Sequence, residues 1–315
     1  MHAKLLAHEL PGAELVMVYD ASPEAATRLG VSVAGSAEEL VAASDVDAVA
    51  ICSPSDTHID LVVLAAEAGK AIFCEKPISL DLAEVDRALA AVERAGVLFM
   101  VGFNRRFDPG HRSVRDAVAA GEVGEVHVVR ITSRDPEPPP LEYIRRSGGL
   151  FLDMTIHDFD MARYVTGSEV VTVFARGAVR VDPAIGAAGD IDTAALILTH
   201  ADGTLTLIDN SRRAAYGYDQ RVEAFGSKGM ASSRNLPSHG GLRRTATGAA
   251  EPRLPTFFLD RYIPSYLAEW EAFLSAVAAG GPSPVPLVDG RAPLLVGIAA
   301  HRSLREERPV PVGAG

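Results

Sequence analysis

Cysteine is scarce in this sequence, since Cys52 and Cys74 are the only thiols among 315 residues. Two thiols cannot build the dense disulfide framework that stabilises small secreted domains. At roughly 150 residues per domain, this length predicts about two domains, each with its own core. Apolar residues make up 48% of the chain and charged residues 23%, a composition that excludes intrinsic disorder.

Long apolar runs are also missing. The longer ones, such as residues 47–52 and 194–198, fall far short of the ~20 residues that cross a bilayer. The first eleven residues, M-H-A-K-L-L-A-H-E-L-P, contain no apolar signal core. We therefore expect no membrane span and no export, and we expect the protein to be cytoplasmic.

Positive charge is in short supply. Lysine plus arginine number 30 against 41 aspartate plus glutamate, so the formal net charge is −11. Such a chain does not attract a polyanion, and nucleic acid is not an expected partner. Lysine is rarer still, at positions 4, 70, 76 and 228 only. Because arginine is the usual cation in this sequence, the use of lysine at any one position needs an explanation.

The first 103 residues alternate between apolar strands and helical segments. Strands are predicted at 14–19, 47–52, 71–74 and 98–102, and helices at 23–29, 36–43, 57–68 and 81–95. Nearly continuous apolar strands separated by helices indicate a parallel sheet buried on both faces. We therefore predict a doubly wound, Rossmann-like α/β domain over residues 1–103.

Beyond this domain the strands become longer and alternate between apolar and polar residues. They are predicted at 125–134, 170–181, 193–199, 204–212 and 220–225. The tripeptide Ala201-Asp202-Gly203 signals a hairpin between two of them. The pattern predicts a second, α+β domain over residues 104–290, with a large, open, mainly antiparallel sheet and a helix at 153–165 on one face. We expect the last helix, 291–307, to pack near the first domain.

Ligands of an open parallel sheet bind beyond the carboxyl ends of its strands. Asp20 stands at such an end. Its carboxylate can accept hydrogen bonds from both hydroxyls of an adenosine ribose and repels a 2′-phosphate, which favours NAD over NADP. The alternative is that Asp20 only caps the helix that follows. Residues 53–58 and 74–77 place further polar groups at the same sheet edge.

Lys76 directly follows a buried strand, so its ammonium must be held by partners or point into a cleft. A compact amine that can lose its proton is suited to hydrogen-bond a substrate hydroxyl, and arginine cannot replace it in that role. The alternative is a surface ion pair with Glu75.

Asp153 and His157 lie four residues apart and share one face of a predicted helix. A carboxylate beside an imidazole fixes its tautomer and raises its basicity, which makes His157 a candidate general base. The alternative is a helix cap at Asp153 and a solvated His157. Asp158 and Asp160 suggest a metal site only weakly, because no second histidine lies at a ligand spacing. We expect no metal.

Five motifs occur in order between residues 53 and 230: S-P-S-D-T-H, E-K-P, V-G-F-N-R-R-F-D, S-G-G-L-F-L-D-M-T-I-H-D-F-D-M-A-R and N-S-R-R-A-A-Y-G-Y-D-Q-R-V-E-A-F-G-S-K-G-M. Together they resemble the family of glucose-fructose oxidoreductase, inositol dehydrogenase and the rhizopine catabolism protein (Gfo/Idh/MocA), over nearly the whole chain. The resemblance implies an NAD-dependent dehydrogenase that oxidises a cyclic polyol, myo-inositol at its axial hydroxyl above all. It also implies a homotetramer assembled through the open face of the second sheet.

The same resemblance implies roles for individual residues. Lys76, Asp153 and His157 would form the catalytic trio. The polyol site would contain Asn104 and Arg105, together with Tyr216 or Tyr218, although each tyrosine could instead pack on the sheet. The residues that would hold NAD are Asp20, Ser53, Pro54, His58, Glu75 and Lys76.

The sequence departs from the family at its start, where the strand and the G-x-G-x-x-G turn are missing. The acidic residue of a dinucleotide fold follows this motif by about 20 residues, and counting back from Asp20 passes the first residue. We expect the natural gene to extend upstream by roughly 15 to 20 residues, and a protein that starts at Met1 to be poorly soluble and to bind NAD weakly. For the function, the alternatives to an inositol dehydrogenase are the same chemistry on another sugar or cyclitol and a sugar-binding or regulatory protein without turnover. A metal-dependent hydrolase is a more distant alternative.

Overall fold

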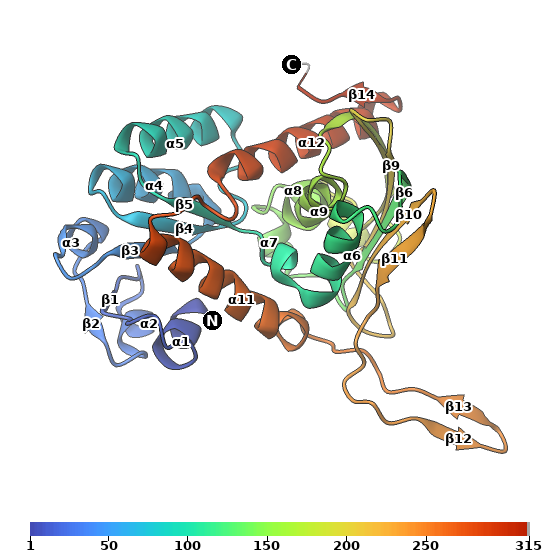
Figure 1. Cartoon of the computed structure of the whole chain (residues 1–315), viewed down its shortest axis with the longest axis horizontal. Helices are drawn as coiled ribbons and strands as arrows, with labels where there is room; N and C mark the ends of the chain where they lie inside the picture. The colour runs from blue at the N-terminus through green and yellow to red at the C-terminus, as the bar shows by residue number, and fades with distance from the viewer. Residues whose placement is uncertain (314–315) are drawn as a thin grey trace. The chain divides into compact units, whose positions relative to one another are not determined.

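The computed structural model describes residues 1–313 and divides the chain into two compact units (Figure 1). The first unit contains Met1–Asn104 and Tyr266–Ala292. The second contains Arg105–Ser265 and the residues from Pro293 on. The predicted boundary after residue 103 therefore lies within one residue of the observed one.

The end of the chain is divided differently from the prediction. Residues 266–290, expected in the second domain, cluster with the first unit, and residues 293–307, expected near the first domain, cluster with the second. Aromatic stacking explains the first difference. The rings of Trp270 and Phe73 lie with their centroids 4.2 Å apart, and Phe273 packs edge-on against both.

The strands of the first unit are parallel, as their apolar runs predict, but they form two sheets and not one. β1 (Met17–Val18) pairs with β2 (Ser32–Val33). The second sheet has the order β3-β4-β5, with β3 at Ala48–Ile51, β4 at Ala71–Glu75 and β5 at Phe99–Gly102. Among residues 1–313 no strand pairs with both the β1-β2 sheet and the β3-β4-β5 sheet.

Before the first strand lies α1 (His2–His8), and four helices connect the strands: α2 (Pro23–Thr27), α3 (Ala37–Ala42), α4 (His58–Glu67) and α5 (Leu82–Ala95). The helices predicted at 57–68 and 81–95 are thus confirmed as α4 and α5. The ends of α5 follow from its sequence. Asp81 accepts a hydrogen bond from the Ala83 amide, and Gly96 terminates the helix with a φ of 64°.

The second unit is built on a seven-stranded sheet of order β11-β10-β6-β9-β8-β7-β14. Its strands are β6 (Val126–Arg134), β7 (Val170–Ala178), β8 (Thr193–His200), β9 (Leu205–Ser211), β10 (Asp219–Gly226), β11 (Gly229–Ser233) and β14 (Val310–Pro311). Neighbours pair antiparallel except β6 and β9, which are parallel. The hairpin predicted at Ala201-Asp202-Gly203 is confirmed between β8 and β9.

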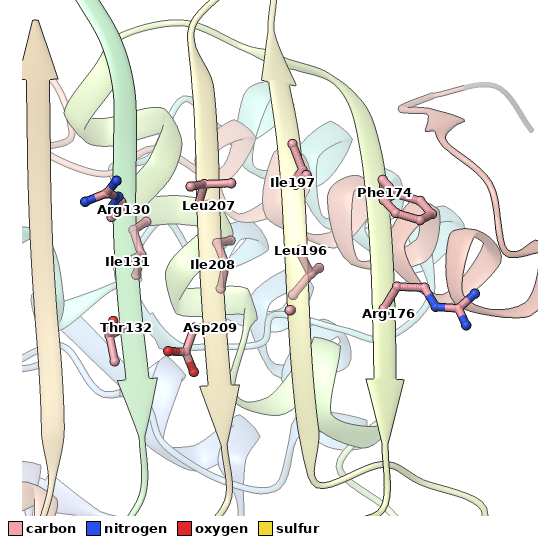
Figure 2. Close-up of a pocket in the computed structure, with 11 residues that line it drawn as sticks. Arg130, Ile131, Thr132, Phe174, Arg176, Leu196, Ile197, Leu207, Ile208 and Asp209 are labelled. Atoms are coloured by element: carbon pink, nitrogen blue, oxygen red, sulfur yellow. The ribbon is translucent and has the colours of Figure 1, made fainter.

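The two faces of this sheet differ. One face packs on helices, in a core that includes Phe151, Phe159 and Leu196. The helices of the unit are α6 (Pro109–Ala119), α7 (Leu141–Ile144), α8 (Gly149–Asp153), α9 (Ile156–Thr166) and α10 (Pro183–Ala187). Figure 2 looks onto the other face, where Ile197 and Leu207 project from their strands.

Three further elements complete the chain. A two-stranded hairpin of β12 (Arg243–Thr245) and β13 (Gly248–Ala250) has exposed residues throughout. The long helices α11 (Phe258–Ala279) and α12 (Leu287–Glu306) each have residues in both units. A search of residues 1–313 finds no helix with the length and apolar character that a membrane span needs.

The helix predicted at 153–165 is interrupted, which corrects one expectation. Asp153 is the last residue of α8, and His157 belongs to α9. At the break, the Leu150 carbonyl accepts from the amides of both Met154 and Thr155. Asp153 and His157 are therefore not neighbours one turn apart on a single helix.

Candidate active site

His58 joins the turns that follow β3 and β4 in the first unit. Its Nδ1 lies 3.0 Å from the Pro77 carbonyl oxygen and its Nε2 lies 2.9 Å from that of Ser53. Carbonyl oxygens only accept, so whichever ring nitrogen carries a proton donates to the carbonyl beside it. Because the side chain is buried and both nitrogens are engaged, His58 shapes these turns through the backbone.

Asp20 follows β1 and is exposed. Its Oδ1 accepts a hydrogen bond from the Ser22 amide at 2.8 Å, just before α2. Ser53 and Pro54, which follow β3, are exposed as well, and the Ser53 hydroxyl lies 2.6 Å from that of Thr57. These groups stand at the carboxyl ends of parallel strands and present an acidic acceptor and a hydroxyl, which fits the ribose hydroxyls of a dinucleotide.

Glu75 and Lys76 end β4 in the same unit. One Glu75 oxygen, Oε1, lies 2.8 Å from Nε2 of His2. The other, Oε2, accepts from the backbone amide of Lys76 at 3.1 Å. Both carboxylate oxygens of Glu75 therefore have partners within the first unit, and the Lys76 side chain is half-buried beside them.

Asp153 is held by two donors in the second unit. The Tyr143 hydroxyl donates to Oδ1 at 2.8 Å, and Nη1 of Arg212 lies 3.2 Å from Oδ2. Arg212 is completely buried and also contacts Asp190 at 3.4 Å. Asp190 in turn accepts from the Leu150 amide near the start of α8. The arginine therefore fixes both the Asp153 carboxylate and the helix that carries it.

The carboxylates that raised the question of a metal are paired with arginines. Nη1 of Arg105 lies 2.8 Å from Oδ1 of Asp158, and Arg106 binds Asp160 through two nitrogens. Burial raises the pKa of Asp158, and the Arg105 charge opposes this shift. Among residues 1–313, no group of three or more histidine, cysteine, aspartate or glutamate side chains could hold a metal ion.

Asp135 was missed by the sequence reasoning. It follows β6 directly, and burial raises its pKa to about 6. The carboxylates of Asp153 and Asp158 raise this pKa further, while Arg105 and Arg212 oppose them. A strongly perturbed carboxyl among other charged groups is a candidate for function. Its position directly after an alternating strand was the signal that could have found it.

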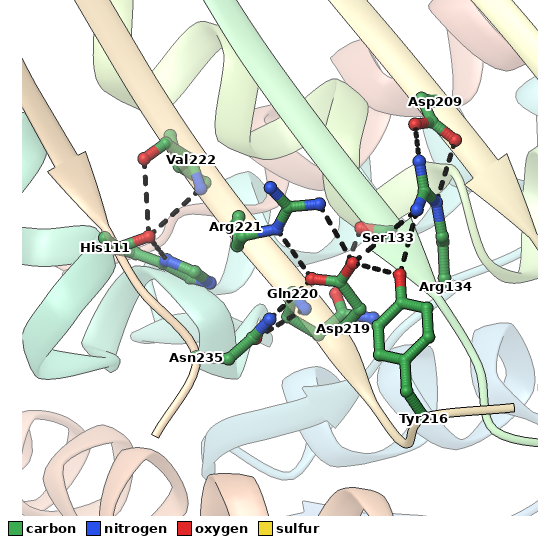
Figure 3. A network of polar contacts seen from close by, with 11 residues as sticks. His111, Ser133, Arg134, Asp209, Tyr216, Asp219, Gln220, Arg221, Val222 and Asn235 are labelled. Atoms are coloured by element: carbon green, nitrogen blue, oxygen red, sulfur yellow. Dashed lines mark hydrogen bonds and ion pairs between the residues drawn. The ribbon is translucent and has the colours of Figure 1, made fainter. Parts of the chain in front are cut away.

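The remaining predicted residues lie in different surroundings. Tyr216 is 49% exposed, and its hydroxyl donates to Asp219 at 2.6 Å and accepts from Arg134 at 2.9 Å. Figure 3 shows this network, in which Asp219 also binds the side chains of Arg221 and Asn235.

Tyr218 is buried, by contrast, and its ring packs edge-on against Tyr262, which also lies 5.9 Å from the Arg105 guanidinium. Tyr218, but not Tyr216, is therefore grouped with Arg105. Asn104 is buried at the end of the first unit. The proposed trio is likewise divided, since Lys76 belongs to the first unit and both Asp153 and His157 to the second.

Parallel strands with an acidic residue after β1, followed by a unit with an open mixed sheet, define a two-domain, NAD-dependent oxidoreductase. Family comparisons agree. Residues 1–103 match the model described as "Oxidoreductase family, NAD-binding Rossmann fold", and residues 111–232 match the "GFO/IDH/MocA C-terminal domain". The chain belongs to the Gfo/Idh/MocA oxidoreductase family.

Individual relatives are similar over most of the chain. Myo-inositol 2-dehydrogenase of Thermotoga maritima is 52% identical over 86% of this chain and 81% of its own length. Inositol 2-dehydrogenase of Rhizobium meliloti is 48% identical over 99% of this chain and 95% of its own. The crystal structure of scyllo-inositol dehydrogenase from Lactobacillus casei, with NAD(H) and scyllo-inositol bound, has 30% identity and a TM-score of 0.92, covering 99% of this chain and 95% of that one.

Proposed function

We propose that this enzyme oxidises myo-inositol to 2-keto-myo-inositol with NAD as the oxidant. The observation that carries the proposal is the cluster of buried carboxylates and arginines around Asp153. Hydroxyl groups both donate and accept hydrogen bonds, so a polyol is a suitable ligand for paired carboxylates and guanidinium groups. The names of relatives that are 52% and 48% identical support inositol as the polyol.

In the proposed reaction, His157 removes the proton from the reacting hydroxyl. Asp153, fixed by Tyr143 and Arg212, orients and stabilises the imidazole as it gains this proton. The ammonium of Lys76 hydrogen-bonds the hydroxyl oxygen and stabilises negative charge that develops on it. Bound NAD supplies the hydride acceptor, so the carbon that loses its hydride and its hydroxyl proton becomes a ketone.

The other hydroxyls of the ring need partners as well. We assign Asn104 and Arg105 to this task, with Tyr218 or Tyr216 from the segment before β10. Asp135 joins them, because a carboxyl with a pKa of about 6 is largely ionised at neutral pH and then accepts from a polyol. For NAD we assign Asp20, Ser53, Pro54, His58, Glu75 and Lys76.

We also propose that the enzyme is a homotetramer in the cytoplasm. The open face of the seven-stranded sheet leaves Ile197, Leu205 and Leu207 exposed by 42%, 40% and 37%. Arg130 and Asp209 line the same hollow surface as Ile197 and Leu207 (Figure 2). Apolar residues gathered between charged ones are typical of a contact between copies of one chain. The free thiols of Cys52 and Cys74 suit a reducing compartment.

One experiment tests the activity. The protein is incubated with NAD and, in turn, myo-inositol, scyllo-inositol, chiro-inositol and glucose, while the absorbance of NADH is followed. We expect the highest kcat/KM with myo-inositol. A higher value with scyllo-inositol would move the assignment to that isomer, and protein that binds NAD but reduces none with any of these compounds would contradict a dehydrogenase.

A further inference from the structure

His2, the first residue of α1, is a buried histidine in a largely apolar setting. Its ring is buried among Phe73, Tyr266 and Trp270, with centroids 5.6, 5.4 and 5.7 Å away. Both ring nitrogens have polar partners in spite of this apolar setting. Nδ1 lies 3.0 Å from Nε1 of Trp270, and Nε2 lies 2.8 Å from Oε1 of Glu75.

These two contacts determine where the proton of His2 lies. The indole nitrogen of Trp270 only donates, so Nδ1 of His2 must accept and carries no proton. A neutral imidazole then carries its proton on Nε2, which donates to Oε1 of Glu75. The second oxygen of Glu75, Oε2, accepts from the backbone amide of Lys76 at 3.1 Å. A continuous series of hydrogen bonds thus runs from Trp270 through His2 and Glu75 to the main chain of Lys76.

We propose that Trp270 and His2 are positioning residues for Lys76, and that they act through the carboxylate of Glu75. This rests on the proposed role of Lys76 at the reacting hydroxyl. A lysine side chain has four rotatable bonds, so the ammonium can be placed reproducibly only if the main chain beneath it is fixed. Hydrogen bonds at both oxygens prevent the Glu75 carboxylate from rotating, and this holds the Lys76 amide in one orientation.

The indole N–H of Trp270 requires an unprotonated Nδ1 on His2. Glu269, next to Trp270 in α11, is fully buried, and burial together with the charge of Glu75 raises its pKa well above the ordinary value. This shift favours the uncharged form of Glu269, and Glu75 is the carboxylate that contacts His2. The other neighbours of the ring named above are aromatic. A neutral His2 can accept from Trp270, whereas an imidazolium could not.

Two substitutions at His2 separate positioning from packing. His2→Gln keeps an acceptor for Trp270 and a donor for Glu75, because its amide oxygen and nitrogen are spaced like the two ring nitrogens. His2→Phe keeps an aromatic ring but removes both hydrogen bonds. We expect His2→Phe to lower kcat by about 10- to 100-fold with KM for NAD and inositol changed less than about threefold. His2→Gln should recover kcat to within about threefold of the wild type.

Two more variants, one at Trp270 and one at Phe273, test the same cluster. Trp270→Phe removes the indole N–H but keeps a ring on Phe73, and we expect it to lower kcat by about three- to tenfold. Phe273→Leu is the matched control, because Phe273 packs on Trp270 in the same cluster and has no hydrogen-bonding group. It should reduce thermal stability and leave kcat unchanged. Equal loss of kcat in Phe273→Leu and His2→Phe would mean that packing alone matters, which overturns the proposal.

The tautomer of His2 gives a readout that does not depend on activity. In protein labelled with 15N at histidine, the signals lost in His2→Gln identify His2, and we expect an unprotonated Nδ1 and a protonated Nε2. A proton on Nδ1 would overturn the proposal even where a variant fails to fold. Unchanged kcat in His2→Phe, while Lys76→Arg is inactive, would also overturn it but leave the proposed function intact. A fully active Lys76→Arg enzyme would instead remove the role of Lys76 on which the proposal rests.

Discussion

Lys76 tests the proposed chemistry at the scale of a single residue. Arginine is the usual cation of this chain, yet its planar guanidinium neither matches a compact ammonium in shape nor loses its proton. We therefore expect Lys76→Arg to lower kcat by about 100-fold or more, with the affinity for NAD nearly unchanged. Steady-state kinetics and a fluorescence titration with NAD measure the two quantities. Wild-type turnover in this variant would show that charge alone is required.

We propose that Asp20 determines the preference for NAD over NADP. Its exposed carboxylate accepts one hydrogen bond from the Ser22 amide, which is compatible both with a cap and with binding a ribose. We expect kcat/KM to be much higher with NAD than with NADP, because the carboxylate repels the 2′-phosphate. Asp20→Ser should reduce this ratio by about 10- to 100-fold. If the wild-type enzyme uses both cofactors equally well, Asp20 acts only as a cap.

The raised pKa of Asp135 makes the stability of the protein depend on pH. Burial, reinforced by Asp153 and Asp158, raises its folded-state pKa to about 6 from the ordinary value of 3.8. Between about pH 4 and pH 6 the folded state therefore binds more protons than the unfolded state, and this group makes the protein less stable as pH rises. The shift of roughly two units corresponds to about 3 kcal/mol of lost stability above pH 6.

We expect Asp135→Asn, which resembles the protonated acid, to remove this loss. Urea unfolding at a series of pH values from 4 to 8 should show a flatter profile for the variant than for the wild type. Asp116→Asn, at an exposed position of α6, is the matched control and should retain the wild-type profile. An unchanged profile in Asp135→Asn would mean that Asp135 titrates at an ordinary pH in the folded protein.

At the scale of elements, the buried guanidinium of Arg212 links α8 to β9. It lies between Asp153 at the end of α8 and Asp190, which accepts from the Leu150 amide within the same helix. Removing one partner from a buried ionic cluster leaves uncompensated charge. We expect Arg212→Met to reduce the free energy of unfolding by about 3–5 kcal/mol, measured by urea denaturation.

The neighbouring Arg213 provides a control for this experiment. Its side chain is 54% exposed and pairs with the exposed Glu137. Exposed ion pairs contribute about 0–1 kcal/mol, so Arg213→Ala should be almost neutral. Similar effects of the two substitutions would contradict the importance of the buried cluster.

Local patterns predicted most elements, because their signals lie within a few residues. The caps of α5 and the hairpin between β8 and β9 are examples. The break between α8 and α9 was not predicted, because it depends on a distant partner. The Thr155 hydroxyl donates to Asn210 on β9 at 2.7 Å, a contact that the spacing of Asp153 and His157 does not reveal. The parallel pairing of β6 with β9 was missed for a similar reason, since alternation defines a strand but not its neighbours.

At the scale of the whole molecule, the sequence identified the motifs but not which segments share a compact unit. The resemblance gave the residues of the candidate site, and the boundary after residue 103 followed from the change in strand pattern. Residues 266–290 were assigned to the wrong side because a helical pattern does not say which core the helix packs on. The stacking of Trp270 on Phe73 decides this. The three-dimensional surroundings made Asp135 and the buried Arg212 candidates, through the perturbed pKa of Asp135 and the ion pairs of Arg212.

The oligomeric state is the prediction that belongs to this scale. In the proposed tetramer, association through the open sheet face would bury Ile197 and Leu207 of each copy, and symmetry would repeat every substitution on both sides of a contact. We expect a tetramer by light scattering, and we expect the double variant Ile197→Lys, Leu207→Lys to give smaller species with the same thermal stability of the individual chain. If the double variant still assembled, each pair of contacting faces would bury several unpaired ammonium groups.

The control for the double variant substitutes an exposed leucine outside the sheet. Leu236 is 64% exposed and lies outside the sheet, in the segment after β11, so Leu236→Lys should remain tetrameric. Because the substituted side chains of β8 and β9 point away from the buried face, loss of assembly need not disturb the core around Leu196 and Ile208. Circular dichroism can verify this. A wild-type protein that is monomeric at micromolar concentration, or a double variant that stays tetrameric, would show that this face is not the contact between copies.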